Sequence, residues 1–157
     1  MKLIVGVADM RLSSSPDDVL VTHGLGSCLG ITVHDPAAHV GGMLHVMMPA
    51  STTNPDKARS NPWMFVDTGI PAFFSALEAA GAARRKWKVK IAGGATVSGS
   101  DYFAIGRKNY VTLKKMLWKA GVLIDAEDVG GNIARTMHME VRSGRVWLNK
   151  SGQEWDL

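Results

Sequence analysis

The sequence predicts a single α+β domain built on mixed β-sheets, and three observations lead to this prediction. The chain has 157 residues, of which 46% are hydrophobic and 20% are charged, as in an ordinary globular domain with a sizeable core. Segments with strand-like alternation outnumber segments with helical spacing. The helical segments interrupt runs of strands instead of alternating strictly with them, which argues against a doubly wound parallel sheet. We therefore expect residues 1–157 to form one domain.

The N-terminal part of the chain is predicted to consist of strands and turns. Alternating apolar residues separated by clusters of Gly, Ser, Asp and Pro indicate four strands. These predicted strands are residues 2–8, 19–22, 28–34 and 42–48. The last two form a hairpin around the turn at residues 35–38. The polar segment 51–61 that follows is expected to be a mobile loop.

Two later segments have apolar side chains at helical spacing. In the first, Asp67 and Thr68 precede the apolar stripe Ile70, Phe73, Phe74 and Leu77, and Gly81 is suited to end the helix. The second runs from about residue 109 to residue 120 and ends at Gly121. The remaining predicted strands are residues 87–92, 122–126, 133–141 and 146–148. Residues 151–157 are expected to be a loosely held tail.

The chain's only cysteine, Cys28, follows a glycine-bracketed turn at residues 24–27. A thiol acts as a nucleophile in its thiolate form, which requires a neighbouring base or a group of main-chain N–H donors. Small residues allow successive amides to point into one concavity, so the N–H groups of Ser27 and Cys28 are expected to stabilise an oxyanion. The candidate bases are His23, His34, His39, His45 and His138.

Hairpin geometry favours His45 among these bases. If the turn that joins the two strands centres on residues 37–38, His45 lies opposite Gly30. Cys28 and Gly30 have the same strand parity, so Cys28 and His45 project from one face as diagonal neighbours, with α-carbons about 7–8 Å apart. Gly30 is expected to leave room for the imidazole. A register shift of one residue would separate the pair, and His23, just before the turn, would then be the rival base.

Several short motifs, in matching order along most of the chain, resemble those of the CheD family, the chemoreceptor glutamine deamidases of bacterial and archaeal chemotaxis. The two most specific are T-H-G-L-G-S-C at residues 22–28 and H-V-M-M-P at residues 45–49. The others are F-V-D-T at 65–68, I-A-G-G-A at 91–95, I-G-R-K-N at 105–109, and D-V-G-G at 128–131 with Arg135. His23 and Met48 depart from the family's usual residues, without changing a residue that the resemblance makes catalytic.

The resemblance implies a fold of two mixed β-sheets packed as a sandwich with flanking helices, and a site distantly similar to that of papain. By position, Cys28 matches the nucleophile, His45 the general base and Thr22 the third member. The implied reaction converts a glutamine side chain of a chemoreceptor's cytoplasmic helix to glutamate and ammonia through a Cys thioester, without a cofactor. A cytoplasmic location and association with the CheC phosphatase are also implied.

The composition of the chain limits which other functions are possible. One cysteine allows no internal disulfide, and zinc is not expected because the chain lacks a second cysteine and a histidine pair at ligand spacing. No apolar run is long enough to span a membrane. The net charge of +4 includes the basic cluster at residues 84–90, which is either a solvated surface or a contact for an acidic partner. Nucleic acid is not expected as a partner. Two other functions compete with catalysis: a regulatory adaptor that binds CheC, and a redox-sensing thiol protein.

Overall fold

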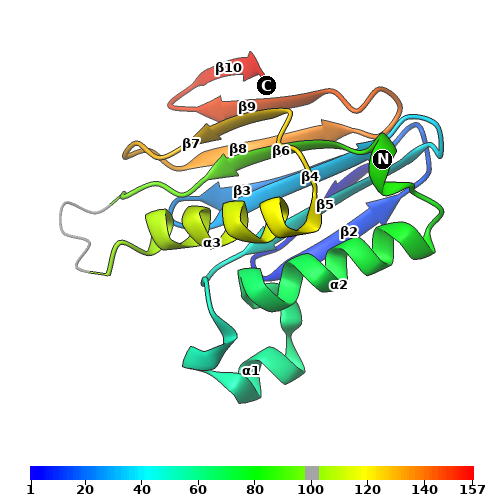
Figure 1. Cartoon of the computed structure of the whole chain (residues 1–157). Coiled ribbons are helices and arrows are strands. Elements are labelled where there is room, and N and C mark those ends of the chain that lie inside the picture. The colour runs from blue at the N-terminus through cyan, green and yellow to red at the C-terminus, as the bar shows by residue number, and fades with distance from the viewer. Residues whose placement is uncertain (98–102) are drawn as a thin grey trace.

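The computed structural model describes residues 1–97 and 103–157, and within these residues ten strands form two five-stranded sheets (Figure 1). The first sheet consists, in spatial order, of β1 (Lys2–Ile4), β3 (Val19–Leu25), β8 (Arg135–Glu140), β9 (Val146–Lys150) and β10 (Gln153–Asp156). The second consists of β2 (Asp9–Ser13), β5 (Val40–Val46), β4 (Leu29–Asp35), β6 (Lys88–Gly93) and β7 (Ala126–Val129). The pairs β1–β3 and β6–β7 are parallel and the others are antiparallel. The predicted α+β fold with two mixed sheets is confirmed.

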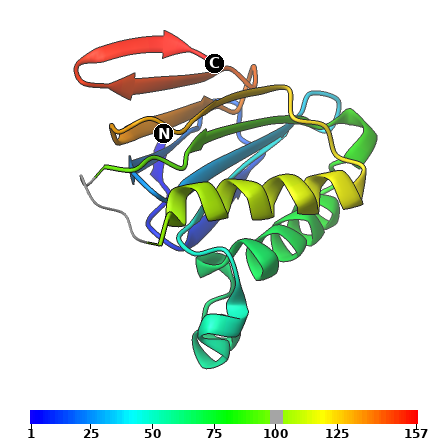
Figure 2. The same cartoon turned by 60° about the vertical axis from the view of Figure 1, so that its left-hand side comes forward.

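Helices cover only one side of this sandwich. The longer helices α2 (Val66–Ala79) and α3 (Ile105–Ala120) lie side by side on the second sheet (Figures 1 and 2). The short elements are η1 (Ser51–Thr53), α1 (Pro55–Ser60), η2 (Pro62–Met64) and η3 (Arg84–Lys86). In the described part of the chain, no helix combines the length and the apolar composition needed to cross a bilayer.

The second sheet is therefore the middle layer and is buried on both faces. Its strands β4 and β5 have no exposed residue. One core lies between this sheet and the helices and includes Leu44, Ile70 and Leu113, whereas the other lies between the two sheets and includes Met43 and Met137. Alternate side chains of β4 and β5 thus enter different cores, because successive side chains of a strand point to opposite faces.

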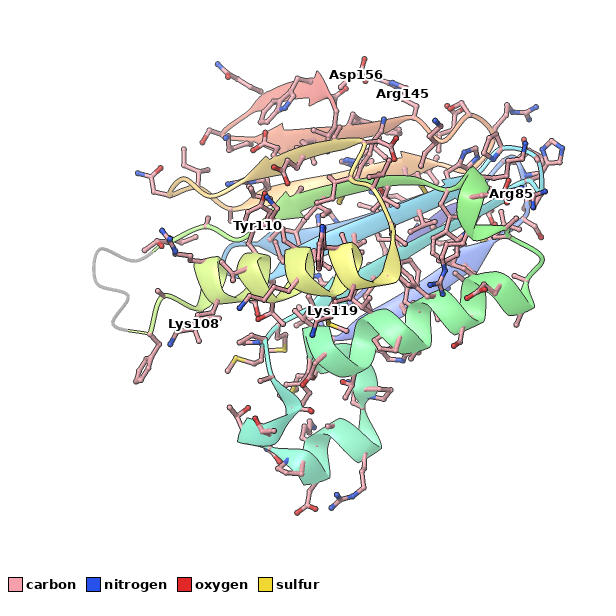
Figure 3. The ribbon with its side chains drawn as sticks, viewed as in Figure 1. Arg85, Lys108, Tyr110, Lys119, Arg145 and Asp156 are labelled. Carbon is pink, nitrogen blue, oxygen red and sulfur yellow. The ribbon has the colours of Figure 1, made fainter. Side chains whose placement is uncertain are left out.

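The C-terminal segment differs from the prediction, because residues 151–157 are not a loose tail. Ser151 and Gly152, both with positive φ, form a two-residue turn from β9 into β10. Such turns suit a hairpin because their twist matches that of the strands. Trp155 packs against the core between the sheets, and Arg145 Nε donates to Asp156 Oδ1 at 2.7 Å (Figure 3). The S-G pair at residues 151–152 was the sequence signal for this hairpin.

Other predicted elements also have different bounds, and the helix expected from about residue 109 begins at residue 105. The segment 2–8 is not one strand: β1 ends at residue 4, and β2 begins at Asp9 in the other sheet. The loop expected at 51–61 contains η1 and α1, and the Asn54 side chain caps α1 by accepting from Lys57 N at 3.1 Å. The strand expected at 122–126 begins only at residue 126.

The basic cluster at residues 84–90 is partly used within the fold. The Arg84 guanidinium pairs with Glu78 at 2.8 Å and lies over the rings of Phe74 and Trp87. Lys90 Nζ donates to a main-chain oxygen of Leu157 at 2.6 Å. These contacts give part of the cluster a structural role.

Candidate active site

Cys28 lies in the turn that leads from the first sheet to the second. Strand β3 has an irregular register between Thr22 and Leu25, and Gly24 has a φ of 69°. The chain then crosses to β4, which begins at Leu29. Cys28 is half-buried and packs against the edge of the core between the sheets. The turn therefore delivers the thiol to the seam where the two sheets meet.

The β4–β5 hairpin has the predicted register. Gly30 pairs with His45 and Asp35 pairs with Val40, so the turn centres on residues 37–38 as expected. His45 is completely buried, and its side chain points toward the first sheet, where it meets Thr22. The expectation that Gly30 leaves room for the imidazole stays a prediction, and the structure gives Gly30 a further role in packing. A Cβ on Gly30 would lie 2.9 Å from both Leu25 Cδ1 and Met137 Sδ, so packing of the first sheet requires this glycine.

The hydroxyl of Thr22 determines which nitrogen of His45 carries the hydrogen. Thr22 Oγ1 donates to the carbonyl oxygen of Val5 at 2.8 Å, and it also lies 2.6 Å from His45 Nδ1. A hydroxyl has one hydrogen, so Thr22 must accept from His45 and Nδ1 must be the protonated nitrogen. This leaves Nε2 with its lone pair. Nε2 is buried and has no hydrogen-bond partner in the residues that the structure describes.

Burial favours the neutral forms of both His45 and Cys28. Burial lowers the pKa of His45 to about 4, while the negative charge of Asp9, directly opposite on β2, acts in the other direction. Burial also raises the pKa of the Cys28 thiol, and the residue's own main-chain N–H partly offsets this. At neutral pH the imidazole is therefore an uncharged acceptor and the Cys28 thiol is protonated. No hydrogen bond joins the two side chains in the described structure, because Nε2 has no partner there.

Three consecutive carbonyl groups of the cysteine turn are bound to the body of the protein. Ala95 N donates to Gly26 O at 2.7 Å, Asn109 Nδ2 to Ser27 O at 3.0 Å, and Gly94 N to Cys28 O at 2.9 Å. In a trans peptide the N–H points opposite to the preceding C=O. The N–H groups of Ser27 and Cys28 therefore point away from these anchors, and neither donates to another of the described residues.

The turn at Gly93 and Gly94 supports this arrangement through close contact. Gly93 has a φ of 114°, and a Cβ there would lie 2.1 Å from Cys28 O. Only glycine allows the backbone to approach the cysteine turn this closely. This close approach of the two backbone segments explains why a G-G pair lies next to the site.

Two residues near the site were not singled out by sequence reasoning. Asn109 was noted only as part of a helix entrance, but its buried side chain contacts the cysteine turn. Its position in register with Leu113 on the apolar face of α3 was an available signal, because an amide at a core position needs partners. Asp9 carried no comparable signal, since its place beside His45 depends on strand pairing between distant segments.

The other candidate histidines lie elsewhere in the fold. His23 is exposed, with Nδ1 3.3 Å from Thr136 Oγ1. His34 Nε2 lies 2.9 Å from Val141 O, and the His138 ring stacks on Trp147. His39 lies in the hairpin turn with a φ of 56°. None of these four histidines is in contact with Thr22 in the way that His45 is.

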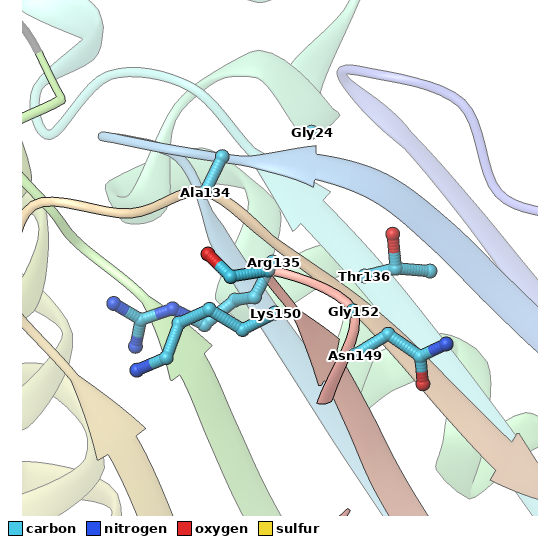
Figure 4. A pocket seen from close by; sticks show the side chains of 8 residues that line it. Gly24, Ala134, Arg135, Thr136, Asn149, Lys150 and Gly152 are labelled. Carbon is cyan, nitrogen blue, oxygen red and sulfur yellow. The ribbon is translucent and has the colours of Figure 1, made fainter. Parts of the chain in front are cut away.

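A pocket of about 300 Å³ lies beside the cysteine turn, next to Gly24 (Figure 4). Arg135 and Lys150 supply basic groups to its lining. The Arg135 guanidinium is held by Asp128 Oδ1 at 2.7 Å and by main-chain oxygens that include Gly130 O. The lining includes neither Cys28 nor His45, so this pocket is separate from the candidate catalytic side chains. Over the described ranges, no group of His, Cys, Asp and Glu side chains is arranged to hold a metal ion.

Comparison with known proteins places these observations in a family. Residues 47–150 match the family model CheD, described as CheD chemotactic sensory transduction. The match begins after Thr22, Cys28 and His45, so the family model does not cover these three residues.

Full-length relatives extend the similarity across the whole chain. The chain is 47% identical over 157 residues to a protein of Solibacter usitatus named "Probable chemoreceptor glutamine deamidase CheD", with 99% of this chain and 93% of the relative covered. It is 44% identical over 151 residues to "Probable chemoreceptor glutamine deamidase CheD 1" of Syntrophus aciditrophicus, covering 96% and 94%. A relative from Anaeromyxobacter dehalogenans is 42% identical over 150 residues, covering 95% and 94%. With this similarity over nearly its full length, the chain belongs to the CheD family.

Proposed function

We propose that this protein is a chemoreceptor glutamine deamidase, which hydrolyses selected glutamine side chains of a receptor's cytoplasmic helices to glutamate and ammonia. Family membership and the names of the relatives support the substrate class. The observation that carries the proposal is the state of His45. Its Nδ1 is held by Thr22 while Nε2 keeps a free lone pair, and the His45 side chain faces the first sheet, as does the core against which Cys28 packs. A base prepared in this way is what a thiol nucleophile requires.

In the first half of the proposed reaction, His45 Nε2 removes the proton from Cys28 Sγ as the sulfur attacks the amide carbon. A C–S bond forms, and the carbonyl electron pair moves to oxygen, where the N–H groups of Ser27 and Cys28 are available as donors. Thr22 Oγ1 accepts a hydrogen bond from Nδ1–H and so holds the imidazolium ring in its orientation. The imidazolium then gives its proton to the nitrogen of the substrate amide, and the C–N bond breaks. Ammonia is released, and the substrate carbonyl remains attached to Cys28 as a thioester.

The second half regenerates the enzyme. Neutral His45 takes a proton from water, and the resulting hydroxide attacks the thioester carbon. The C–S bond breaks, the carboxyl group of glutamate is released, and the Cys28 sulfur recovers its proton from the imidazolium. This cycle uses only side chains and main-chain groups of this chain, so no cofactor is required. The receptor substrate also makes a cytoplasmic location part of the proposal.

The experiment that tests the proposal measures ammonia released from a purified receptor cytoplasmic fragment during incubation with the protein. We expect stoichiometric ammonia release, together with conversion of specific glutamines to glutamates in peptide mass spectra. A protein that binds the CheC phosphatase but releases no ammonia would instead be a regulatory adaptor. A thiol that responds to oxidants without any deamidation would indicate a redox sensor.

The burial of Cys28 and His45 predicts a particular pH dependence of thiol reactivity. Because the pKa of His45 is lowered to about 4 and that of Cys28 is raised, proton loss from the free thiol begins only at alkaline pH. The rate of Cys28 alkylation by iodoacetamide should therefore keep rising above about pH 8.5, the ordinary pKa of a cysteine. A rate that levels off in acid would mean that a thiolate–imidazolium pair already exists without substrate. The measurement is the alkylation rate of the free protein between acid and alkaline pH.

A further inference from the structure

The side chain of Asn109 joins the two segments that carry the candidate catalytic residues. It is completely buried in the second turn of α3. Its Nδ2 donates to Ser27 O at 3.0 Å, immediately before Cys28, and to Met47 O at 2.9 Å, two residues after His45. Both N–H groups of the amide are therefore used, one on each segment.

The rest of the Asn109 amide is not satisfied. Its Oδ1 is buried and has no hydrogen-bond partner in the described part of the chain. Buried polar atoms nearly always have partners, and an apolar side chain of similar size would avoid an orphaned oxygen. The amide therefore keeps one orphaned oxygen together with its two hydrogen bonds to Ser27 O and Met47 O. Groups that break such a local rule are expected mainly where function demands them.

The start of α3 is packed tightly enough to hold this amide in place. A Cβ on Gly106 would lie 2.6 Å from Ala95 O and 2.7 Å from Gly94 O, so the helix contacts the turn that binds the cysteine turn. Lys108 and Lys119 project outward from α3 (Figure 3), whereas Asn109 faces inward. The helix therefore presents the amide to the site from a fixed position.

Among the three anchored carbonyls of the cysteine turn, that of Ser27 is held differently. Gly26 O and Cys28 O accept from main-chain N–H groups, which no substitution removes short of proline. Ser27 O accepts from a side chain. The peptide between Ser27 and Cys28 is consequently the one whose orientation depends on a single residue. If that peptide rotated, its oxygen would replace its N–H on the side where the oxyanion forms.

We propose that Asn109 is a positioning residue that locks the Ser27–Cys28 peptide with the Cys28 N–H directed at the oxyanion. This inference rests on the proposed function and assigns to a helix side chain the control of one oxyanion donor. Loss of one such donor typically lowers kcat by about 10²–10³-fold. The effect should be confined to steps that develop charge on the substrate oxygen.

The test compares Asn109→Leu, which removes both donors at similar size, with the wild-type protein in ammonia release from a receptor cytoplasmic fragment. We expect kcat to fall by about 10²-fold, as for a lost oxyanion donor, with KM unchanged. Alkylation of Cys28 by iodoacetamide should fall much less than kcat, because that displacement forms no oxyanion and the Cys28 N–H only partly offsets the effect of burial on the thiol pKa. Asn109→Ala also lacks the donors and adds no charge or bulk, so it serves as the second variant if Asn109→Leu does not fold.

Leu113→Ala is the matched control. Leu113 is buried one turn further along the same face of α3 and has no hydrogen bond to the site, so its truncation lowers stability through a cavity. We expect this control to lose thermal stability and to keep kcat. Wild-type kcat in both Asn109 variants would overturn the inference. A parallel fall of kcat and alkylation rate would also overturn it, because Asn109 would then act on the thiol. Failure of the proposed function would appear separately, as ammonia release that persists without Cys28.

Discussion

Replacement of Cys28 by alanine is expected to lower kcat for ammonia release by at least about 10⁴-fold, the scale seen when a catalytic nucleophile is removed. The physical reason is that the thiol is the nucleophile of the proposed route, and the hydroxyl of Thr22 is already engaged by Val5 O and His45 Nδ1. Activity is measured as ammonia released from the receptor fragment. Peptide mass spectra should show the glutamines unchanged.

The fold of this variant should remain intact. Cys28 is only half-buried and lies at the edge of the core, so loss of its sulfur removes little packing. Thermal unfolding should show a small shift of Tm at most. Cys28→Ser is the matched control for shape, and its hydroxyl should be inactive because a buried neutral imidazole with a pKa of about 4 is a weak base for an alcohol. Ammonia release at the wild-type rate by Cys28→Ala would exclude the thioester route.

Replacement of His45 by alanine is expected to lower kcat by about 10²–10⁴-fold, the usual contribution of general acid–base catalysis. His45 Nε2 keeps a free lone pair, and the His45 side chain faces the first sheet, as does the core against which Cys28 packs. Without it the thiol must lose its proton to solvent, and burial raises the pKa of that thiol. The residual activity of His45→Ala should therefore increase toward alkaline pH. Wild-type activity should already be high at neutral pH.

His23→Ala provides the control for this prediction. His23 is exposed and contacts Thr136, so the variant should keep wild-type activity. His45→Gln fills the buried space better than alanine and covers the case in which His45→Ala fails to fold. The opposite result, an inactive His23→Ala with an active His45→Gln, would require a different base and a different register of the hairpin in solution.

The part of the site within the β4–β5 hairpin was predictable because strands obey a period of two. Once the turn was placed at residues 37–38, the pairing of Gly30 with His45 followed. Cys28 precedes β4, so its common strand face with His45 stays a prediction. The glycine turn before Cys28 was also readable from local sequence. Thr22 was different: its role came from the family resemblance, and its hydrogen bond to Nδ1 crosses from one sheet to the other.

Some elements of the fold were predicted from the sequence and others were missed. The apolar stripes of α2 and α3 determined both helices, because an amphipathic pattern with a terminal glycine is a strong local signal. The final hairpin was missed, although the S-G pair at residues 151–152 permits a two-residue turn. Its strand β10 is stabilised by pairing with β9 and by Trp155 on the core, and such contacts are not visible in a short polar segment.

The sequence by itself determined the strand parity of the hairpin, the two amphipathic helices and the single thiol, because each of these depends on neighbours within a few residues. Only the tertiary structure decided the chemistry of the site. Packing the first sheet onto the second buries His45, aligns Thr22 with its Nδ1, and shifts the pKa values of the imidazole and the thiol toward their neutral forms. The docking of α3 brings Asn109 to the cysteine turn. Burial and hydrogen-bond geometry depend on surfaces contributed by distant segments, and no local pattern contains them.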